Sequence, residues 1–257
     1  MTGKTHKTLY VLEVPIFNTE ENFQIAKDYF KTNSRIKLIE KAQNTVCDIL
    51  SLKFNISEIS EIPAAKKLLS ELLPNITKPL MINGVNNDNI DKELLPELIK
   101  TLDRECIISF ANENTYKEIT PFAIKGNHRL VLKSPIDINL CKELNILTAD
   151  LGMPLEKIII DTDIGGLGYG LDYGYSIMEK VKLENDDYLN MPIISFAAEE
   201  SLKTKEAKSN TFSKSWGDLK TRAQMFEISS AAAVKAAGAD MIVLYNPESI
   251  KIMKGLE

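Results

Sequence analysis

Polar side chains that could do chemistry follow several short apolar runs of this sequence. The clearest are Asp161 and Asp163, which end the run KIIIDTD and precede the stretch IGGLGYG. Such a pair of carboxylates could act as an acid/base pair or bind Mg²⁺. Residues two apart on an extended strand point to opposite faces, however. The alternative is structural: Asp161 accepts hydrogen bonds from loop amides, and Asp163 caps the following turn.

Similar polar residues end or follow the other apolar runs. They are amides, hydroxyls and carboxylates: Asn83, Asn86, Asn112, Glu113, Ser134, Asp137, Asn139, Asp161, Asp163, Ser195, Glu199 and Asn246. The set contains no His, Lys or Cys. Lys133 lies inside RLVLKSP, ahead of the expected strand end, so a Schiff-base lysine is not predicted. The two histidines, His6 and His128, are expected at the surface, and a zinc hydrolase would need more of them.

The glycine-rich stretch contains Gly165, Gly166 and Gly168, followed by Tyr169. Its spacing is not GxGxxG, and no Lys-Ser/Thr pair follows as in a P-loop. Two interpretations stay open. The glycines could let backbone approach a broad, flat partner, with tyrosine supplying an apolar face. They could equally form a tight turn between a strand and a helix.

Composition narrows the function classes. The 257 residues are 44% hydrophobic and carry a net charge of −5 without a basic stripe, so nucleic acid is not an expected partner. There is no leader pattern and no apolar run of about 18 residues, which predicts a cytoplasmic protein without a membrane span. Cys47, Cys106 and Cys141 lie far apart, so we expect buried reduced thiols and no iron–sulfur cluster in this chain.

Eight short β-branched runs alternate with helix-like stretches. The runs cover 8–16, 47–55, 79–84, 106–112, 129–135, 157–163, 192–197 and 241–247; helix-like stretches include 22–30, 64–73, 92–102, 138–152 and 222–238. This alternation predicts an α/β fold, a single (β/α)8 TIM barrel over 1–257 with a short leader at 1–7. A doubly wound open sheet is the competing architecture. In a barrel the polar strand ends would meet at one mouth.

One long connection, Lys203 to Ser215, is polar and mixed in charge. It could be a mobile loop that orders on a partner, or a solvated excursion. Trp216, the only tryptophan, follows it directly. A large aromatic at this place is a candidate anchor for a partner interface.

Four motifs, taken in order, carry a resemblance to a known family. They are PIDINL, LGYGLDYGYSIME, WGD and AGAD. In this order they resemble the barrel of the small (delta) subunit of the corrinoid iron–sulfur protein. That protein is part of the carbon monoxide dehydrogenase/acetyl-CoA synthase, or acetyl-CoA decarbonylase/synthase, system. The resemblance covers roughly residues 79 to 254 well and the first third weakly.

This resemblance implies a non-catalytic TIM barrel that pairs as a heterodimer with a large subunit holding an iron–sulfur cluster and a corrinoid (cobalamin). The barrel mouth would cover the cobalt face while a methyl group passes from a methyl-pterin, through a methyltransferase, to acetyl-CoA synthase in the reductive acetyl-CoA (Wood–Ljungdahl) pathway. Trp216 would lie at the partner interface. Corrinoid- or partner-facing residues would be Asn83, Asn112, Ser134, Asp137, Asn139, Asp161, Asp163, Gly165, Gly166, Gly168, Tyr169, Ser195 and Asn246.

The sequence also keeps two alternatives open. One is a pterin-dependent methyltransferase that binds methyltetrahydrofolate itself, with Asn83, Asn112, Asp137 and Asp161 as candidates for the pterin ring. The other is a diverged paralogue that serves another corrinoid system. This chain has neither a DxHxxG corrinoid motif nor a four-cysteine cluster motif, so it would not carry the methyl group alone.

Overall fold

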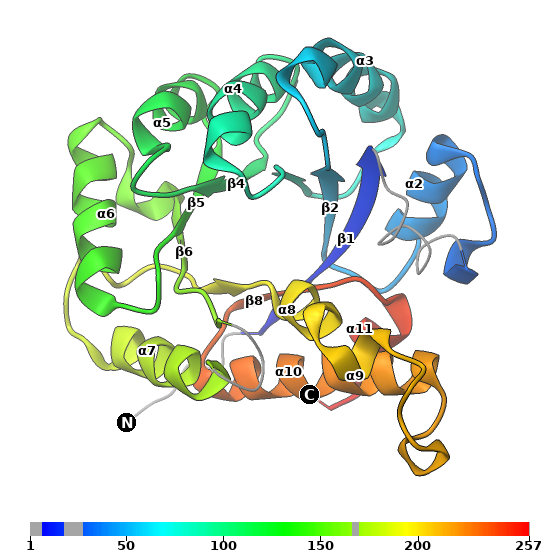
Figure 1. The fold of residues 1–257 in the computed structure, drawn as a ribbon. Helices are drawn as coiled ribbons and strands as arrows, with labels where there is room; N and C mark the ends of the chain where they lie inside the picture. The colour runs from blue at the N-terminus through cyan, green and yellow to red at the C-terminus, as the bar shows by residue number, and fades with distance from the viewer. Residues whose placement is uncertain (1–6, 18–27, 166–169, 257) are drawn as a thin grey trace.

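The computed structural model describes residues 7–17, 28–165 and 170–256. Within them, parallel strands form a barrel surrounded by helices, as the sequence predicts (Figure 1). The strands are β1 (Leu9–Phe17), β2 (Ile49–Phe54), β3 (Leu80–Asn83), β4 (Ile107–Ala111), β5 (Arg129–Lys133), β6 (Ile158–Asp161), β7 (Ile194–Ser195) and β8 (Met241–Leu244). Each lies within, or within one residue of, a predicted run.

Neighbouring strands follow the order β6-β5-β4-β3-β2-β1-β8-β7. A parallel bridge between Ile160 and Ile193 joins the two outer strands, β6 and β7, and closes the barrel. The Ile160 amide donates to the Pro192 carbonyl at 2.8 Å across this seam. Closure excludes the doubly wound open sheet.

The helices are α2 (Arg35–Gln43), α3 (Ile62–Leu72), α4 (Asp88–Ile99), α5 (Tyr116–Lys125), α6 (Ile138–Asp150), α7 (Leu171–Leu183), α8 (Ala197–Lys203), α9 (Lys205–Lys208), α10 (Leu219–Ala237) and α11 (Pro247–Gly255). Stretches 64–73, 92–102, 138–152 and 222–238 are helical over most of their length. The predicted helix at 22–30 lies mostly outside the described residues. The extent of the domain, 1–257 with a leader at 1–7, stays a prediction.

Strand alternation divides the apolar side chains between two cores. Side chains that face outward, such as Leu12, Leu50 and Ile82, pack with the surrounding helices. Those that face inward, including Val11 and Met81, fill the barrel with residues from the other strands. Because successive strand residues point to opposite faces, strands buried on both sides are apolar along their whole length. This explains the continuous runs in the sequence.

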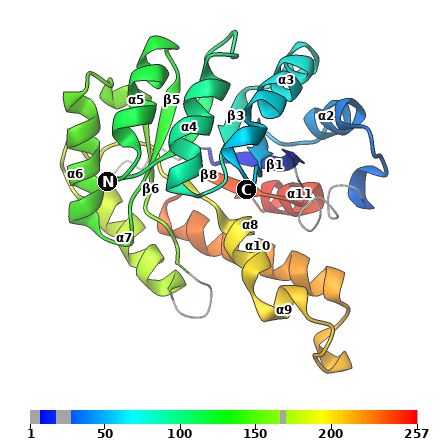
Figure 2. The same cartoon turned by 45° about the horizontal axis from the view of Figure 1, so that its top comes forward.

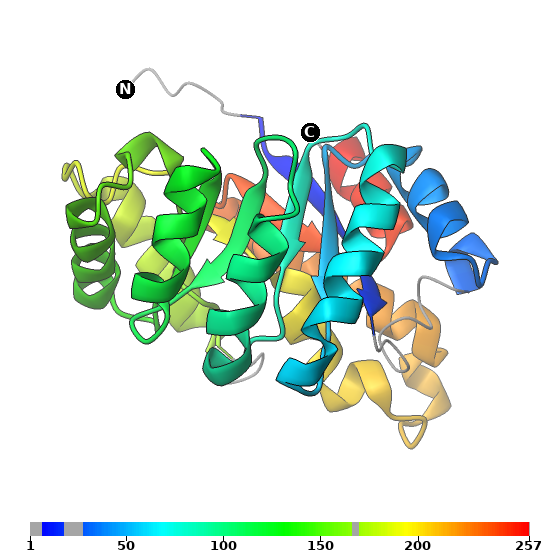
Figure 3. The same cartoon turned by 90° about the horizontal axis from the view of Figure 1, so that it is seen from above.

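The start of β1 and the α8–α9 segment lie at opposite ends of the barrel. Figure 3 shows the start of β1 on one side and α9 on the other, where the strands end. In Figure 2, α8 and α9 lie beside α10 and project past the barrel. No helix among the described residues has the length and apolar character needed to cross a membrane.

Candidate functional site at the barrel mouth

Inward-facing residues in the carboxyl-terminal parts of the strands, together with Glu199 of α8, form a polar layer, which we call the mouth. Its residues are Glu13, Ser51, Lys53, Asn83, Ser109, Lys133, Asp161, Glu199 and Tyr245. The predicted residue Ser195 is not among them, because Ile194 packs inside the barrel and Ser195 therefore faces the helix layer. The strand register supports this grouping, since Lys53 pairs with Asn83 and Asn83 with Ser109. Neighbouring strands therefore bring these side chains to one level inside the barrel.

Glu13 lies at the centre of the first half of the mouth. It is 1% exposed, and its Oε2 accepts hydrogen bonds from Ser51 Oγ at 2.9 Å and Asn83 Nδ2 at 2.7 Å. Lys53 Nζ lies 3.9 Å from Glu13 Oε1 and 3.0 Å from Glu199 Oε2. One lysine thus joins β1 and β2 to α8.

Ionisation in this cluster depends on the pairing. Burial alone would lower the pKa of Lys53, but the carboxylates of Glu13 and Glu199 outweigh it and raise that pKa. Burial likewise favours neutral Glu199, yet Lys53, Lys203 and Lys133 bring its pKa down to about 2. Both groups are therefore charged at neutral pH. Lys53 depends on these carboxylates, because an unpaired buried charge is costly.

Asp161 occupies the second half of the mouth, at the end of β6. It is 2% exposed, and its Oδ1 accepts from the Asp163 amide at 2.9 Å. Burial, aided by the charge of Asp163, raises the pKa of Asp161 to about 7 although Lys133 opposes the shift. Near neutral pH this carboxyl is therefore present in both forms, so it can donate or accept a hydrogen bond.

Lys133 corrects the expectation that the mouth contains no lysine. It is the last residue of β5, not an interior one, and pairs in register with Asp161. Its Nζ lies 3.6 Å from Asp163 Oδ2 and 5.0 Å from the centre of the Phe110 ring. Burial alone would lower the pKa of Lys133, but the charges of Asp161, Asp163 and other carboxylates raise it.

Two polar atoms of the mouth, Ser109 Oγ and Asp161 Oδ2, are buried without a hydrogen-bond partner in the described part of the chain. Leaving a buried polar group unsatisfied costs about 1–3 kcal/mol. A polar interior with free donors and acceptors is suited to water or to polar groups of a ligand.

Sequence reasoning missed Glu13 and Lys53. Both are charged residues inside otherwise apolar strands, LYVLEVPIF and ILSLKF. Strand periodicity was the available signal: each has the same parity as the inward-facing apolar residue two or four positions earlier. Both residues precede the last residue of their strand, so a search limited to strand ends does not find them.

Other predicted residues stabilise turns at this end of the barrel. Asp137 Oδ1 accepts from the amides of Asn139 and Leu140 and caps α6. Asn246 Oδ1 accepts from the Glu248 amide and caps α11.

Two further predicted residues lie close by. Asn112 Nδ2 donates to Asp88 Oδ1 at 2.7 Å and links the connection after β4 to the start of α4. Ser134 is 2% exposed and neighbours Cys141 of α6. Because Lys133 points into the barrel, Ser134 faces the helix layer.

The turn after β6 packs against its own helix. Asp163 Oδ1 accepts from the amides of Ile164 at 2.8 Å and Gly165 at 3.2 Å, which matches the structural alternative for this pair. Gly165 has a φ of +60°, and a Cβ on Gly174 of α7 would lie 2.8 Å from the Ile164 Cα. These glycines serve the tight turn. The predicted residues Gly166, Gly168 and Tyr169 lie outside the described residues.

The predictions for histidine and cysteine had different outcomes. Cys47, Cys106 and Cys141 are buried free thiols, as predicted. The surface position expected for His128 was wrong, because this residue is 2% exposed. Its Nδ1 accepts from the Cys106 amide at 3.1 Å, which ties the start of β5 to that of β4. His6 lies outside the described residues.

The connection between α9 and α10 carries the predicted interface residue. Trp216 is 52% exposed and lies 5.2 Å from the Phe212 ring, measured between centroids. Arg222 of α10 is 6% exposed and binds carbonyls of this segment, including Ser209 at 2.5 Å and Gly217 at 3.2 Å. A buried guanidinium thus holds the segment that presents the tryptophan.

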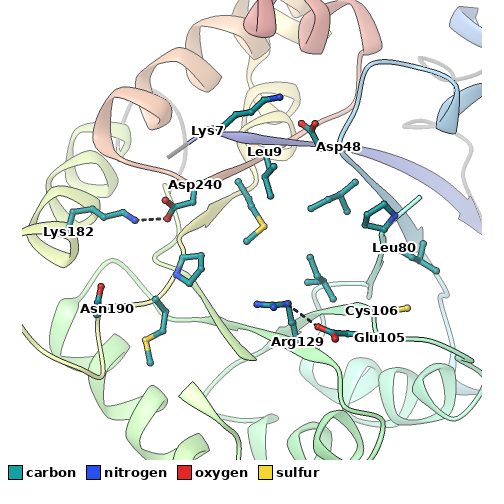
Figure 4. A pocket seen from close by; sticks show the side chains of 16 residues that line it. Lys7, Leu9, Asp48, Leu80, Glu105, Cys106, Arg129, Lys182, Asn190 and Asp240 are labelled. Atoms are coloured by element: carbon teal, nitrogen blue, oxygen red, sulfur yellow. Dashed lines mark hydrogen bonds and ion pairs between the residues drawn. The ribbon is translucent and has the colours of Figure 1, made fainter. Parts of the chain in front are cut away.

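A pocket of about 900 Å³ lies at the other end of the barrel, where the strands begin (Figure 4). Its charged rim contains ion pairs between Lys182 and Asp240 and between Arg129 and Glu105. It includes no predicted site residue. Within the described ranges no cluster of three or more His, Cys, Asp or Glu could hold a metal ion.

Solved structures identify the fold class. Dihydropteroate synthase from Xanthomonas albilineans in complex with 7,8-dihydropteroate is 10% identical, with a TM-score of 0.61 over 97% of this chain and 94% of that one. A dihydropteroate synthase from Coxiella burnetii in complex with pteroic acid is 12% identical, with a TM-score of 0.63 over 97% of this chain and 93% of that one. At this identity the likeness shows the fold class alone, a (β/α)8 barrel.

The family follows from sequence comparison. The family model described as "CO dehydrogenase/acetyl-CoA synthase delta subunit" matches residues 6–255, and the chain belongs to this family. Acetyl-CoA decarbonylase/synthase complex subunit delta 1 from Methanosarcina thermophila is 31% identical over 76% of this chain and 48% of its own length. Subunit delta from Methanocaldococcus jannaschii is 28% identical over 74% and 47%. The chain spans about half the length of these curated relatives.

Proposed function

We propose that this barrel is a non-catalytic subunit of a corrinoid iron–sulfur protein in a complex of the CO dehydrogenase/acetyl-CoA synthase type. The family match over residues 6–255 carries the proposal. A large subunit would hold the corrinoid and the iron–sulfur cluster, and the mouth would cover the corrinoid. The heterodimer would work in the cytoplasm, receiving a methyl group from a methyl-pterin through a methyltransferase and passing it to acetyl-CoA synthase.

The mouth suits such a role chemically. A corrinoid carries amide side chains on its rim, and an amide offers both N–H donors and a carbonyl acceptor. Asp161, with one unpartnered oxygen, could accept from such an amide, and Lys133 could donate to its carbonyl. The cobalt, when bound, would carry the methyl group. The chain would position the corrinoid and exclude water.

The predicted corrinoid- or partner-facing residues fall into two groups under this proposal. Asn83 and Asp161 lie in the mouth and would face the cofactor. Asn112, Asp137 and Asn246 hold the turns around it. These turns would present the surface that meets the large subunit. Asn139, Asp163, Gly165 and Ser134 belong to or adjoin the same turns.

Co-expression with a corrinoid-bearing large subunit tests this function. We expect a stable heterodimer whose ultraviolet–visible spectrum shows the corrinoid. Asp161→Asn should shift that spectrum while the heterodimer persists. Glu179→Gln, which removes the same charge from the exposed face of α7, should leave the spectrum unchanged. Failure of the unsubstituted chain to form a complex would refute the proposal.

Trp216 allows an independent measurement of the interface. Half of its surface is exposed, so burial by a partner should shift its fluorescence to shorter wavelength. An unchanged spectrum in a proven heterodimer would remove Trp216 from the interface. Trp216→Ala should weaken the complex by at least about tenfold if this residue is an anchor.

A pterin-dependent methyltransferase is the second candidate. The observation in its favour is the carboxyl of Asp161, which shares the mouth with Asn83. Its Oδ2 has no hydrogen-bond partner among the described residues, and burial raises its pKa to about 7. Asn112 and Asp137, the other candidates, already bind neighbouring groups in their turns. Titration with methyltetrahydrofolate decides the matter: binding that Asp161→Asn abolishes would favour the enzyme, and no binding up to about 10 mM would exclude it.

A further inference from the structure

A second cavity of about 520 Å³ lies between the connections that follow β7 and β8. Its apolar walls are Leu202 of α8, Ala207 of α9, and Leu219 and Ala223 of α10. Asn246, at the start of α11, contributes a polar edge. This volume is within the range of pockets that enclose small organic molecules. The cavity is separate from the mouth network around Glu13.

The polar lining of this cavity is mostly acidic. Asp28, Glu227 and Glu248 contribute carboxyl groups, and Lys220 is the single basic residue among the described lining residues. Glu248 also accepts a hydrogen bond from Tyr29 Oη at 3.0 Å, and Lys251 lies 3.9 Å from its other oxygen. The described groups therefore place three carboxyl groups and one lysine around an apolar space.

Glu227 is the most unusual of these groups. It is 2% exposed, although it lines the cavity from the middle of α10. Its Oε1 accepts from the amides of Tyr245 at 2.6 Å and Asn246 at 3.2 Å, which fixes the carboxyl in one orientation. No lysine or arginine is among its hydrogen-bond or ion-pair partners in the described ranges.

The location of these carboxyl groups is informative. In (β/α)8 barrels the connections after strands seven and eight frequently bind phosphate, using backbone amides and positive charge. Here the same region presents carboxyl groups, which above about pH 7 include an ionised Glu227 and would repel an anion. A cation would gain charge-assisted hydrogen bonds while its apolar part covered the alanine and leucine walls.

We propose that this cavity binds a small organic cation with an apolar body, through Glu227. Benzamidine is a suitable probe because it joins a planar cation to an apolar ring. Benzamide has nearly the same shape without charge, and benzoate has the opposite charge. We expect benzamidine to bind, benzamide to bind about tenfold more weakly, and benzoate not to bind up to about 10 mM.

Saturation-transfer NMR on the full chain gives the affinities, and three variants locate the site. Glu227→Gln should weaken benzamidine binding about tenfold, and Ala223→Leu should abolish binding by filling the cavity. Glu179→Gln, which removes one distant negative charge, should bind like the unsubstituted chain.

Three outcomes would overturn the proposal: no benzamidine binding, equal binding of benzoate, or full binding by Ala223→Leu. The last variant keeps Glu227, so it remains informative if Glu227→Gln fails to fold. The test needs no large subunit or corrinoid. It is therefore independent of the function proposed above.

Discussion

Replacement of Glu227 by Gln tests how burial controls ionisation in this barrel. Glutamine keeps the shape and retains an oxygen that can accept from the amides of Tyr245 and Asn246. It removes only the ability to ionise. Two effects oppose each other at this carboxyl: burial disfavours the charged form, and the two amide hydrogen bonds favour it. Burial is the larger effect and raises the pKa of Glu227 to about 7.

The magnitude follows from this pKa. A rise from the ordinary 4.5 to about 7 corresponds to about 3 kcal/mol of unfolding free energy. Below 4.5 both folded and unfolded chains are protonated at this group, and the stabilisation is fully present. As the pH rises towards 7 the unfolded chain releases its proton first, so stability falls. Glu227→Gln lacks this loss and should gain about 2–3 kcal/mol on the unsubstituted chain between about pH 5 and pH 8.

Urea unfolding, followed by circular dichroism, measures this difference at several pH values. Asp161 also has a raised pKa, but it is present in both proteins and cancels in the comparison. Glu179→Gln, at an exposed position of α7, serves as the control for the substitution itself. If Glu227→Gln gave a difference that did not change with pH, or lost stability as the pH rose, burial would not be the dominant effect and the reasoning would be refuted.

Three further variants examine the mouth, the turn after β6 and the buried histidine. Lys53→Ala removes the cation beside the buried carboxylate of Glu13 and one of the two cations that pair with Glu199. It should lower the unfolding free energy by about 3–5 kcal/mol in urea; a loss below about 1 kcal/mol would contradict a buried pair. Gly174→Ala should lower the unfolding free energy by about 1–3 kcal/mol, because its new Cβ would meet the backbone of Ile164 in the turn after β6. Gly255→Ala, whose Cβ would meet no atom, should leave the unfolding free energy nearly unchanged in the same assay. Burial lowers the pKa of His128, so the unfolded chain binds a proton first and stability should fall below about pH 6.5; thermal melts of His128→Asn should show no such fall.

Much of the fold was predictable from local pattern. Apolar runs buried on both faces, each followed by an amphipathic stretch, predicted the eight strands and the barrel. The predicted helix ends were less accurate than the predicted strands, because a helix end depends on capping contacts. The α4 helix starts four residues before the predicted stretch, where Asn87 caps it.

The candidate site was predictable in part. Asn83 and Asp161 do reach the mouth, because the carboxyl ends of parallel strands meet there, whereas Ser195 faces the helix layer. Asn112, Asp137 and Asn246 lie at the same end but stabilise turns. A polar residue after a strand can serve either purpose. Only its hydrogen-bond partners, as the folded chain places them, distinguish the two.

The sequence by itself determined the barrel, the family and the group of polar strand ends, because these depend on periodicity and motifs that are local in the chain. Tertiary structure alone decided which charges are paired. Lys53 meets Glu199 from 146 positions away, and the oxygen of Glu227 meets amides 18 and 19 positions away. Burial and pairing set the pKa of each group, and both are properties of the folded chain. The charge pattern of the mouth and of the acidic cavity therefore follows from the fold.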